Sequence, residues 1–418
     1  MQTKLSPEFK DTQRGNAADA ILRSCVHCGF CNATCPTYQL LGDELDGPRG
    51  RIYLIKQLLE GGEAGRSTQV HLDRCLTCLN CETTCPSGVE YGKLVSIGRE
   101  LIEERVARPP LERLKRWALK EGLTSAFFSP ALRVAQTFRR WLPDEWRHKL
   151  PIRPTGGREA AGPAPARDRK MLLLAGCVQP AMMPNVNGAT ARVLDAAGIQ
   201  ILVAAGAGCC GALREHLADH AGGLNDARRN INAWWPLVAD GTVEAIVVNA
   251  SACGLAVKQY GEALRGDAVY AEKAARISAL TRDLSELLPE LVPLLRDRVR
   301  VPAGRVAVHT PCTLQHGQGL RGGVDAHLAD LGFQVSPPIA ESHLCCGSAG
   351  TYSVLQPTLA NQLRDRKLAQ FAALEPRVIV SANVGCIQHL QSGTSTPVQH
   401  WIEVLDAVLA GGTEAGSP

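Results

Sequence analysis

The sequence predicts a multidomain α + α/β chain, in which an α-helical N-terminal module is followed by two tandem α/β repeats with parallel sheets. Two observations support this fold class. Cysteine-rich loops alternate with amphipathic helical segments before residue 109. Beyond residue 168, short strands rich in Val, Ile and Leu alternate with helices, as in a parallel sheet that is covered on both faces. The length of 418 residues is sufficient for several domains.

The N-terminal module contains one cysteine pattern twice, C-x2-C-x2-C-x3-C-P, over residues 25–36 and 75–86. In bacterial ferredoxins, three closely spaced thiolates of such a run hold one 4Fe-4S cluster and the fourth reaches the other cluster. We therefore predict two 4Fe-4S clusters with crossed ligands, namely Cys25, Cys28, Cys31 and Cys85 for the first cluster, and Cys75, Cys78, Cys81 and Cys35 for the second. Gly29 permits a close approach of the backbone, and Pro36 and Pro86 turn the chain away.

Two other uses of cysteine compete with this interpretation. A disulfide framework is disfavoured because the chain is long enough to bury its own core and begins without a secretory signal. Structural zinc also uses C-x2-C pairs, but without a third cysteine two residues on and without the trailing C-P. Iron–sulfur clusters explain both runs best.

Composition places the chain among ordinary globular proteins, with 45% hydrophobic and 21% charged residues. The formal charge of +4 is mild and gives no reason to expect nucleic acid as a partner. We expect a cytoplasmic protein, since the N-terminus shows neither an apolar signal region nor twin arginines. The apolar runs are too short to span a bilayer, so membrane association is expected to be peripheral or through partners.

Helices are expected over residues 11–24, 52–60 and 93–106, around the two cysteine runs. We place the end of this α-helical ferredoxin-like domain at residue 108. Arg49 and Arg51 lie in the turn-rich link between the runs. Two interpretations stay open for these cations: a position near the negatively charged clusters, or surface salt bridges.

The segment 109–168 is predicted to be a basic and aromatic helical stretch followed by a linker. Residues 105–150 contain eleven Lys or Arg against four Asp or Glu, interleaved with Trp117, Phe127, Phe128, Phe138, Trp141 and Trp146. Such a pattern is typical of a membrane surface or a docking helix. The alternative is a solvated helical face with its aromatic side chains packed inward. Residues 151–165 are rich in Pro, Gly and Ala, which indicates the linker.

The remaining chain repeats itself, and we predict cysteine-rich repeats at 169–300 and 301–418. Each repeat reads strand, helix ending at glycine, strand, cysteine pair, long helix, strand and cysteine loop. Matching cysteines lie 133 to 136 residues apart: Cys177 with Cys312, Cys209 with Cys345, Cys210 with Cys346, and Cys253 with Cys386. Because ligand sites in such sheets lie at the carboxyl ends of the strands, each set of four is expected to converge there.

What these two cysteine sets bind is left open between a further iron–sulfur centre, a zinc ion and no metal. Adjacent cysteines rarely ligate one ion without strain, which favours a multi-iron centre over zinc. His309, His316 and His343 lie near the second set, either as additional ligands or as hydrogen-bonded loop residues.

No flavin or NAD is expected on this chain. It has no G-x-G-x-x-G between a strand and a helix and no P-loop. Nor does it present an acid/base constellation, so we predict no catalytic residue and no substrate oxidation by this chain alone.

These motifs together resemble a known family. Two C-x2-C-x2-C-x3-C-P runs followed by two CCG repeats are similar to the iron–sulfur subunits of glycolate oxidase, anaerobic glycerol-3-phosphate dehydrogenase, lactate-utilisation complexes and heterodisulfide reductase. Residues 25–31, 42–57 and 342–352 most resemble the bacterial glycolate oxidase iron–sulfur subunit. The resemblance implies an electron-transfer subunit that receives electrons from flavin-containing subunits. It also implies delivery to a membrane acceptor such as quinone, with peripheral attachment to the inner membrane through the complex.

The chain departs from the wider CCG pattern, which ends in C-x2-C, because Ala250 and Asn383 replace the first cysteine of that pair. This departure argues against the five-cysteine clusters of heterodisulfide reductase and against disulfide reduction. The alternatives that remain are the equivalent subunit of a lactate or glycerol-3-phosphate dehydrogenase complex, a thiol/disulfide reductase, and a scaffold whose clusters only brace the fold.

Overall fold

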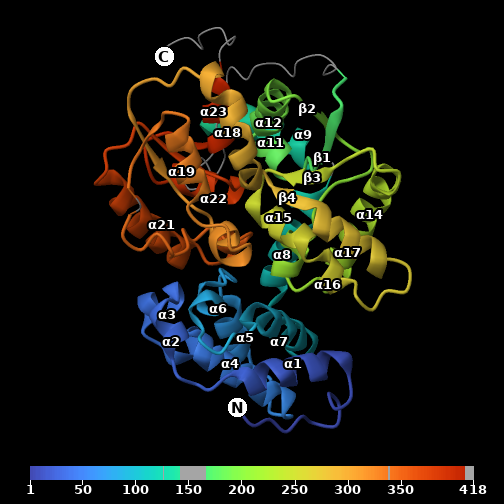
Figure 1. Ribbon diagram of the computed structural model, residues 1–418. Helices are drawn as coiled ribbons and strands as arrows, with labels where there is room; N and C mark the ends of the chain where they lie inside the picture. Colours follow the sequence, from blue (N-terminus) through green and yellow to red (C-terminus); the bar gives the residue numbers. More distant parts are fainter. Residues whose placement is uncertain (126, 142–165, 338, 410–418) are drawn as a thin grey trace.

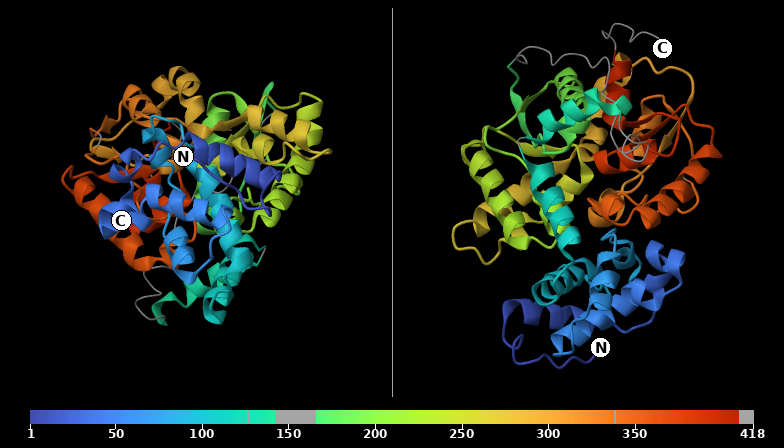
Figure 2. Two further views of the ribbon diagram at one scale, coloured as in Figure 1. Left: turned by 90° about the horizontal axis from the view of Figure 1, so that it is seen from below. Right: turned by 180° about the vertical axis from the view of Figure 1, so that it is seen from behind.

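The structure, a computed structural model, describes residues 1–125, 127–141, 166–337 and 339–409. A helical module at the N-terminus lies below two α/β lobes that stand side by side, as Figures 1 and 2 show. The predicted fold class is confirmed. The predicted linker at 151–165 and Trp146 fall outside the described residues.

The helical module is built on four longer helices that surround the two cysteine loops: α1 (Gln13–Ser24), α4 (Pro48–Leu59), α5 (Arg66–Asp73) and α7 (Tyr91–Arg105). The Thr12 side chain caps α1 by accepting from the Gly15 amide. The helix expected at 52–60 begins four residues earlier, because Pro48 at the first helical turn is compatible with the helix. The core of the module contains fully buried apolar side chains, among them Leu22, Ile55, Leu72 and Leu94.

Short helices follow each cysteine loop. They are α2 (Phe30–Ala33) within the first run, α3 (Pro36–Leu41) at its end, and α6 (Asn80–Thr84) within the second run. Each run thus folds as a tight loop that leads directly into a helical turn. Helix α6 of the second run lies on the side of the module that faces the lobes (Figure 1).

The basic and aromatic segment forms α8 (Pro110–Thr124), α9 (Phe128–Thr137) and a 3-10 turn at Arg139–Trp141. Helix α8 rises from the helical module to the first lobe (Figure 2), and none of its side chains is buried. Four aromatic side chains are more than half exposed: Trp117, Phe127, Phe138 and Trp141. For these four, the alternative of inward packing is wrong. In the described part of the chain, no helix has both the length and the apolar character needed to cross a bilayer.

Each lobe contains a four-stranded parallel sheet. The first has the order β2-β1-β3-β4 and the second β6-β5-β7-β8, so the two sheets share one topology. The strands are β1 (Arg169–Leu173), β2 (Ile199–Leu202), β3 (Ala245–Val248), β4 (Thr281–Asp283), β5 (Arg305–Val308), β6 (Gln334–Val335), β7 (Val378–Ser381) and β8 (Val398–His400). The internal repeat is therefore structural, and parallel pairing is as expected. Strands β4 and β8 were not predicted, because each has only three residues with an exposed polar side chain in the middle.

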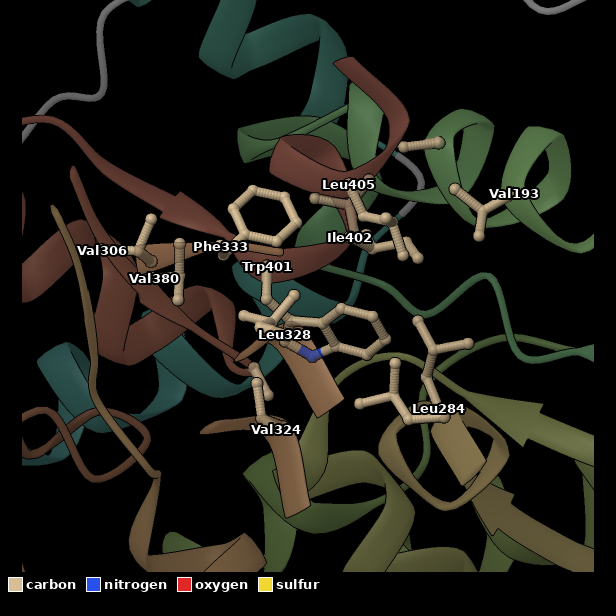
Figure 3. Close-up of a cluster of buried hydrophobic side chains, with 14 of the residues drawn as sticks. Val193, Leu284, Val306, Val324, Leu328, Phe333, Val380, Trp401, Ile402 and Leu405 are labelled. Carbon is tan, nitrogen blue, oxygen red and sulfur yellow. The ribbon is translucent and has the colours of Figure 1, made fainter. Parts of the chain in front are cut away.

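The two lobes share one hydrophobic core. Helix α12 (Asn185–Ala196) of the first lobe packs on α23 (Trp401–Val408) of the second. Figure 3 shows Val193 and Leu284 facing Trp401 and Leu405 across this boundary. Trp401 is 1% exposed. Polar contacts also cross the boundary: the Arg192 guanidinium lies 2.7 Å from the Asp406 carboxylate.

The helical module is attached to both lobes through side chains of the second cysteine run and of α7. Thr77 Oγ1 lies 3.0 Å from His216 Nδ1 of the first lobe, and Thr83 Oγ1 lies 2.9 Å from His316 Nδ1 of the second. Glu100 of α7 lies 3.7 Å from His220 Nδ1 in the first lobe. The second run thus contacts both lobes.

The pH dependence of this junction is set by His220. Its hydrogen bond to Glu215, and then the charges of Glu215 and Glu100, raise the pKa of His220 against the opposing effect of burial. A raised folded-state pKa contributes stability that is complete below the unfolded value of about 6.5 and is lost as pH rises through the folded value. We expect His220→Gln to lower the thermal unfolding temperature at about pH 5.5 more than at about pH 8.5. The matched variant is His327→Gln, because His327 bonds the Gly323 carbonyl instead of an acid. Equal losses at both pH values would contradict this prediction.

Candidate metal centres

The structure brings three cysteines of the first run together with the last cysteine of the second. Cys25, Cys28, Cys31 and Cys85 line one pocket of about 430 Å³. Its walls are largely apolar and include Ile52 and Val89. Cys25 is buried and Cys28 is exposed, so this pocket reaches the protein surface on one side.

A second pocket, of about 300 Å³, is lined by the other four cysteines of the two runs, Cys35, Cys75, Cys78 and Cys81. Pro48, Tyr91 and Cys81 line both pockets, so the two sites share a wall. The pockets thus place Cys85 beside the first three cysteines of the first run, and Cys35 beside those of the second run, while the crossed ligation of two clusters stays a prediction.

The backbone of the two cysteine loops has the same unusual conformation. His27 and Gly29 in the first run have φ of 58° and 87°, and Thr77 and Leu79 at the matching positions have 50° and 61°. Left-handed residues of this kind occur in concavities where successive N–H groups bind an anion. A left-handed non-glycine residue costs on the order of 1 kcal/mol and is retained where the surroundings require it. In the first run, a Cβ at residue 29 would lie 2.8 Å from Arg49 Nη1, so this flexible side chain would have to move aside.

An arginine side chain lies beside each pocket, and the one beside the second pocket is buried. Arg51 is 1% exposed, donates to the His71 carbonyl at 2.8 Å and to Thr37 Oγ1 at 3.2 Å, and lies 4.0 Å from Cys35 Sγ. The interpretation as a surface salt bridge is therefore wrong for Arg51. Arg49 fits both predicted roles, a cation near a cluster and a partner in a salt bridge. It lines the first pocket, and its Nε donates to a Glu44 carboxylate oxygen at 2.5 Å.

Burial makes free thiolates costly in both pockets. It raises the pKa of Cys31 to about 11 and also raises the pKa of Cys35 and Cys81. A buried thiolate needs a compensating cation, which a coordinated metal supplies. Four convergent thiols in a mostly apolar pocket therefore fit an iron–sulfur cluster in each case.

Two residues that the sequence analysis did not single out contact the cysteine sulfurs. Tyr91 is buried and donates its hydroxyl hydrogen to Cys75 Sγ at 3.5 Å. The Thr37 hydroxyl lies 3.3 Å from Cys35 Sγ. Hydrogen bonds to cluster sulfurs influence reduction potential. No motif marks these residues, because their positions depend on how α3 and α7 pack.

The cysteines of each lobe also converge, as predicted. In the first lobe, the Cys209 thiol is within hydrogen-bonding reach of Cys177 and Cys210, and Cys210 reaches Cys253. In the second lobe, the same sequence of contacts joins Cys312, Cys345, Cys346 and Cys386. The last cysteine of each repeat was expected in a loop, but it lies in a helix. Cys253 and Cys386 lie in the first turns of α15 (Ser251–Lys258) and α22 (Val384–Gln391), directly after β3 and β7.

The second lobe adds two features to its thiols. Cys312 is within hydrogen-bonding reach of Cys78, so the lobe's thiols adjoin the second pocket of the helical module. His316 is a hydrogen-bonded loop residue, since its ring nitrogens contact Thr83 and the His343 carbonyl. His309 is instead buried beside Cys346 and Cys386, and His343 is half-buried.

The glycine after each cysteine pair holds the chain close to a helix. Gly211 and Gly347 both have φ of 89°, and a Cβ at residue 347 would overlap the Ala360 carbonyl oxygen. We expect Gly347→Ala to lower the free energy of unfolding by more than about 2 kcal/mol, because backbone overlap adds to the left-handed penalty of about 1–2 kcal/mol. Gly322→Ala is the control, with φ of 70° and open space around its Cβ. Equal losses in chemical denaturation of the two variants would exclude the overlap.

Comparison with known proteins agrees with this arrangement. The model of a 4Fe-4S dicluster domain matches residues 21–89, and the model of a cysteine-rich domain matches residues 171–258 and 306–391. The chain is 27% identical to lactate utilization protein A of Geobacillus thermodenitrificans, over 57% of this chain and 98% of that protein.

Two relatives extend over nearly the whole chain. The probable glycolate oxidase iron-sulfur subunit of Bacillus subtilis is 31% identical, covering 93% of this chain and 92% of its own length. The glycolate oxidase iron-sulfur subunit of Escherichia coli K12 is 52% identical, over 98% of this chain and 99% of that protein. The predicted resemblance is confirmed, and this chain belongs to the family of glycolate oxidase iron-sulfur subunits.

Proposed function

We propose that this chain carries electrons within a glycolate oxidase complex. It receives them from flavin-containing subunits and passes them singly through two 4Fe-4S clusters to a membrane acceptor such as quinone. The observation that carries this proposal is the pair of four-cysteine pockets that share Pro48, Tyr91 and Cys81 as a wall. Neighbouring one-electron carriers in one module provide a path rather than an isolated structural metal.

In this proposal each pocket's cysteines are the cluster ligands: Cys25, Cys28, Cys31 and Cys85 for the first cluster, and Cys35, Cys75, Cys78 and Cys81 for the second. The clusters supply reversible one-electron chemistry. Arg51 offsets negative charge beside Cys35, and the Tyr91 hydroxyl bonds the sulfur of Cys75.

The first cluster site is the one at which a redox partner would exchange electrons. Cys28 is exposed, and the neighbouring Val26 and Phe30 are 69% and 62% exposed. The second pocket faces the second lobe, where Leu76 and Cys78 pack against Cys312 and Tyr352. Exposed apolar side chains around an accessible centre suit a protein partner.

Crossed ligation predicts a distinctive pattern in double variants. Cys35→Ala combined with Cys78→Ala removes two ligands of one cluster, so the iron loss should match that of either single variant, about four irons per chain. Cys35→Ala combined with Cys28→Ala should lose about eight, because the two cysteines belong to different clusters although both lie in the first run. The losses in the two double variants are measured by iron and sulfide analysis and by electron paramagnetic resonance of the reduced, oxygen-free protein. Equal losses in the two double variants would contradict crossed ligation.

The substrate assignment is tested in the assembled complex. With the flavin-containing subunits present and oxygen excluded, glycolate should bleach the visible absorption of the clusters and produce the reduced paramagnetic signal. Lactate and glycerol-3-phosphate are the competing donors. Faster reduction by either of them, or no reduction by glycolate, would contradict the proposed role.

We further propose that the exposed face of α8 and α9 contacts the membrane. Its apolar side chains, here called the α8–α9 surface, are Leu111, Leu114, Trp117, Phe127, Val134, Phe138 and Trp141, all more than half exposed. Exposed Arg113 and Arg133 lie between them. Basic side chains interleaved with aromatic ones suit an anionic lipid surface.

Lipid contact through the α8–α9 surface predicts weaker membrane binding when its aromatic side chains are removed. Trp117→Ala together with Trp141→Ala should reduce co-sedimentation with anionic phospholipid vesicles several-fold, since each ring contributes buried apolar area. Val269→Ala is the control, because Val269 is 64% exposed on the first lobe. Unchanged sedimentation of the double variant would exclude this surface.

A further inference from the structure

Three side chains of the second lobe form a donor group apart from the cysteine runs. His309 directly follows β5, Cys346 belongs to the cysteine pair, and Cys386 lies in the first turn of α22 after β7. One ligand atom of each residue lies within 4.8 Å of the other two. The residues are only 3%, 1% and 7% exposed. Three separate elements thus place one imidazole and two thiols together at the carboxyl end of the sheet.

One ring nitrogen of His309 is held by a hydrogen bond, and the other is available for a metal ion. Its Nδ1 lies 2.9 Å from Ser381 Oγ, which fixes the ring plane. Its Nε2 is buried and has no hydrogen-bond partner among the described residues. An unpaired buried polar atom costs about 1–3 kcal/mol. A hydrogen bond at one ring nitrogen with the other left free is the usual arrangement of a metal-binding histidine.

The first lobe lacks this arrangement, although it shares the fold. Three residues before the first cysteine of the repeat it has the buried Leu174, where the second lobe has His309. In the described part of the chain, the thiols of the first lobe form no comparable three-donor group. Asn383 adds a second difference, since its amide donates to Cys386 Sγ at 3.6 Å, whereas the first lobe has Ala250 at this place. The two copies have diverged at the residues around their thiols.

The surroundings also compensate negative charge. Lys367 is 3% exposed, and its ammonium lies near the thiols of Cys345 and Cys346 while it donates to the Glu341 carbonyl at 2.8 Å. A buried cation at this place offsets part of the negative charge of metal-bound thiolates.

We propose that His309, Cys346 and Cys386 bind one soft divalent metal ion, zinc or ferrous iron, in addition to the clusters of the helical module. One nitrogen and two sulfur donors suit such an ion and leave a fourth tetrahedral position open. Only one cysteine of the adjacent pair takes part, so the strain of ligation by neighbouring residues does not arise. Binding releases the two thiol protons to solvent and involves no change of oxidation state.

The site lies at the end of a line of thiols that begins in the helical module. Cys78 reaches Cys312, Cys312 reaches Cys345, and Cys345 reaches Cys346. The ion would therefore order the part of the second lobe against which the second cluster pocket is packed.

The test measures metal content of the full chain, purified without oxygen. We expect one equivalent of zinc or iron beyond the iron that is matched by sulfide. His309→Leu, which copies Leu174 of the first lobe, and Cys386→Ala should each lose this equivalent and keep the iron and sulfide of the clusters. After metal removal, cobalt(II) should restore sulfur-to-cobalt charge-transfer absorption in the unaltered protein and several-fold less in His309→Leu.

Two control variants separate this site from a general effect of substitution. Cys253→Ala replaces the matching cysteine of the first lobe, and His389→Leu replaces a buried histidine of the second lobe that bonds the Ala360 carbonyl. Both should retain the additional ion. If His309→Leu fails to fold by circular dichroism, His309→Gln takes its place.

Three results would overturn the proposal: no metal beyond the sulfide-matched iron, retention of the ion in both His309→Leu and Cys386→Ala, or additional iron accompanied by equal sulfide. The last result would indicate a cluster instead of a single ion. Because the readout is metal content, it does not depend on whether the chain transfers electrons from glycolate.

Discussion

The cost of burying sulfur anions governs the architecture of this protein. A thiolate placed away from water needs a positive charge and hydrogen-bond donors close by. The helical module meets this requirement with tight left-handed loops, buried Arg51 beside Cys35, and the Tyr91 hydroxyl at Cys75. The same requirement explains why both lobes collect their thiols at strand ends, where loops and helix starts leave polar backbone available.

The sequence was most informative where chemistry requires fixed spacing. The two cysteine runs predicted that all eight of their cysteines gather around two pockets, and apolar strands alternating with helices predicted two parallel sheets. Strands β4 and β8 could not be predicted, because each has only three residues. The middle residue is polar, so neither strand forms an apolar run in the sequence. The approach of Cys312 to Cys78 was also missed, because it depends on how a lobe docks on the helical module. The sequence shows His309 where the first repeat has Leu174, but it does not show that the histidine is buried or that its Nε2 lacks a hydrogen-bond partner among the described residues.

The two copies of the duplicated unit have diverged around their thiols. Sheet order and cysteine positions are retained, whereas the residues around the thiols have changed, with Asn383 and His309 in one copy where Ala250 and Leu174 stand in the other. The duplication also gives the helical module two attachment points, since Thr77 reaches one lobe and Thr83 the other. The second cysteine run is thereby fixed from both sides.

The shared core of the lobes has a consequence for synthesis of the chain on the ribosome. Helix α12 presents Val193 to α23, which is synthesised after the whole first lobe. Until Trp401 and Leu405 arrive, the nascent first lobe exposes an apolar face, and such faces invite aggregation. Neither lobe is thus expected to be an independent folding unit, and a prematurely terminated chain would depend on chaperones or be degraded.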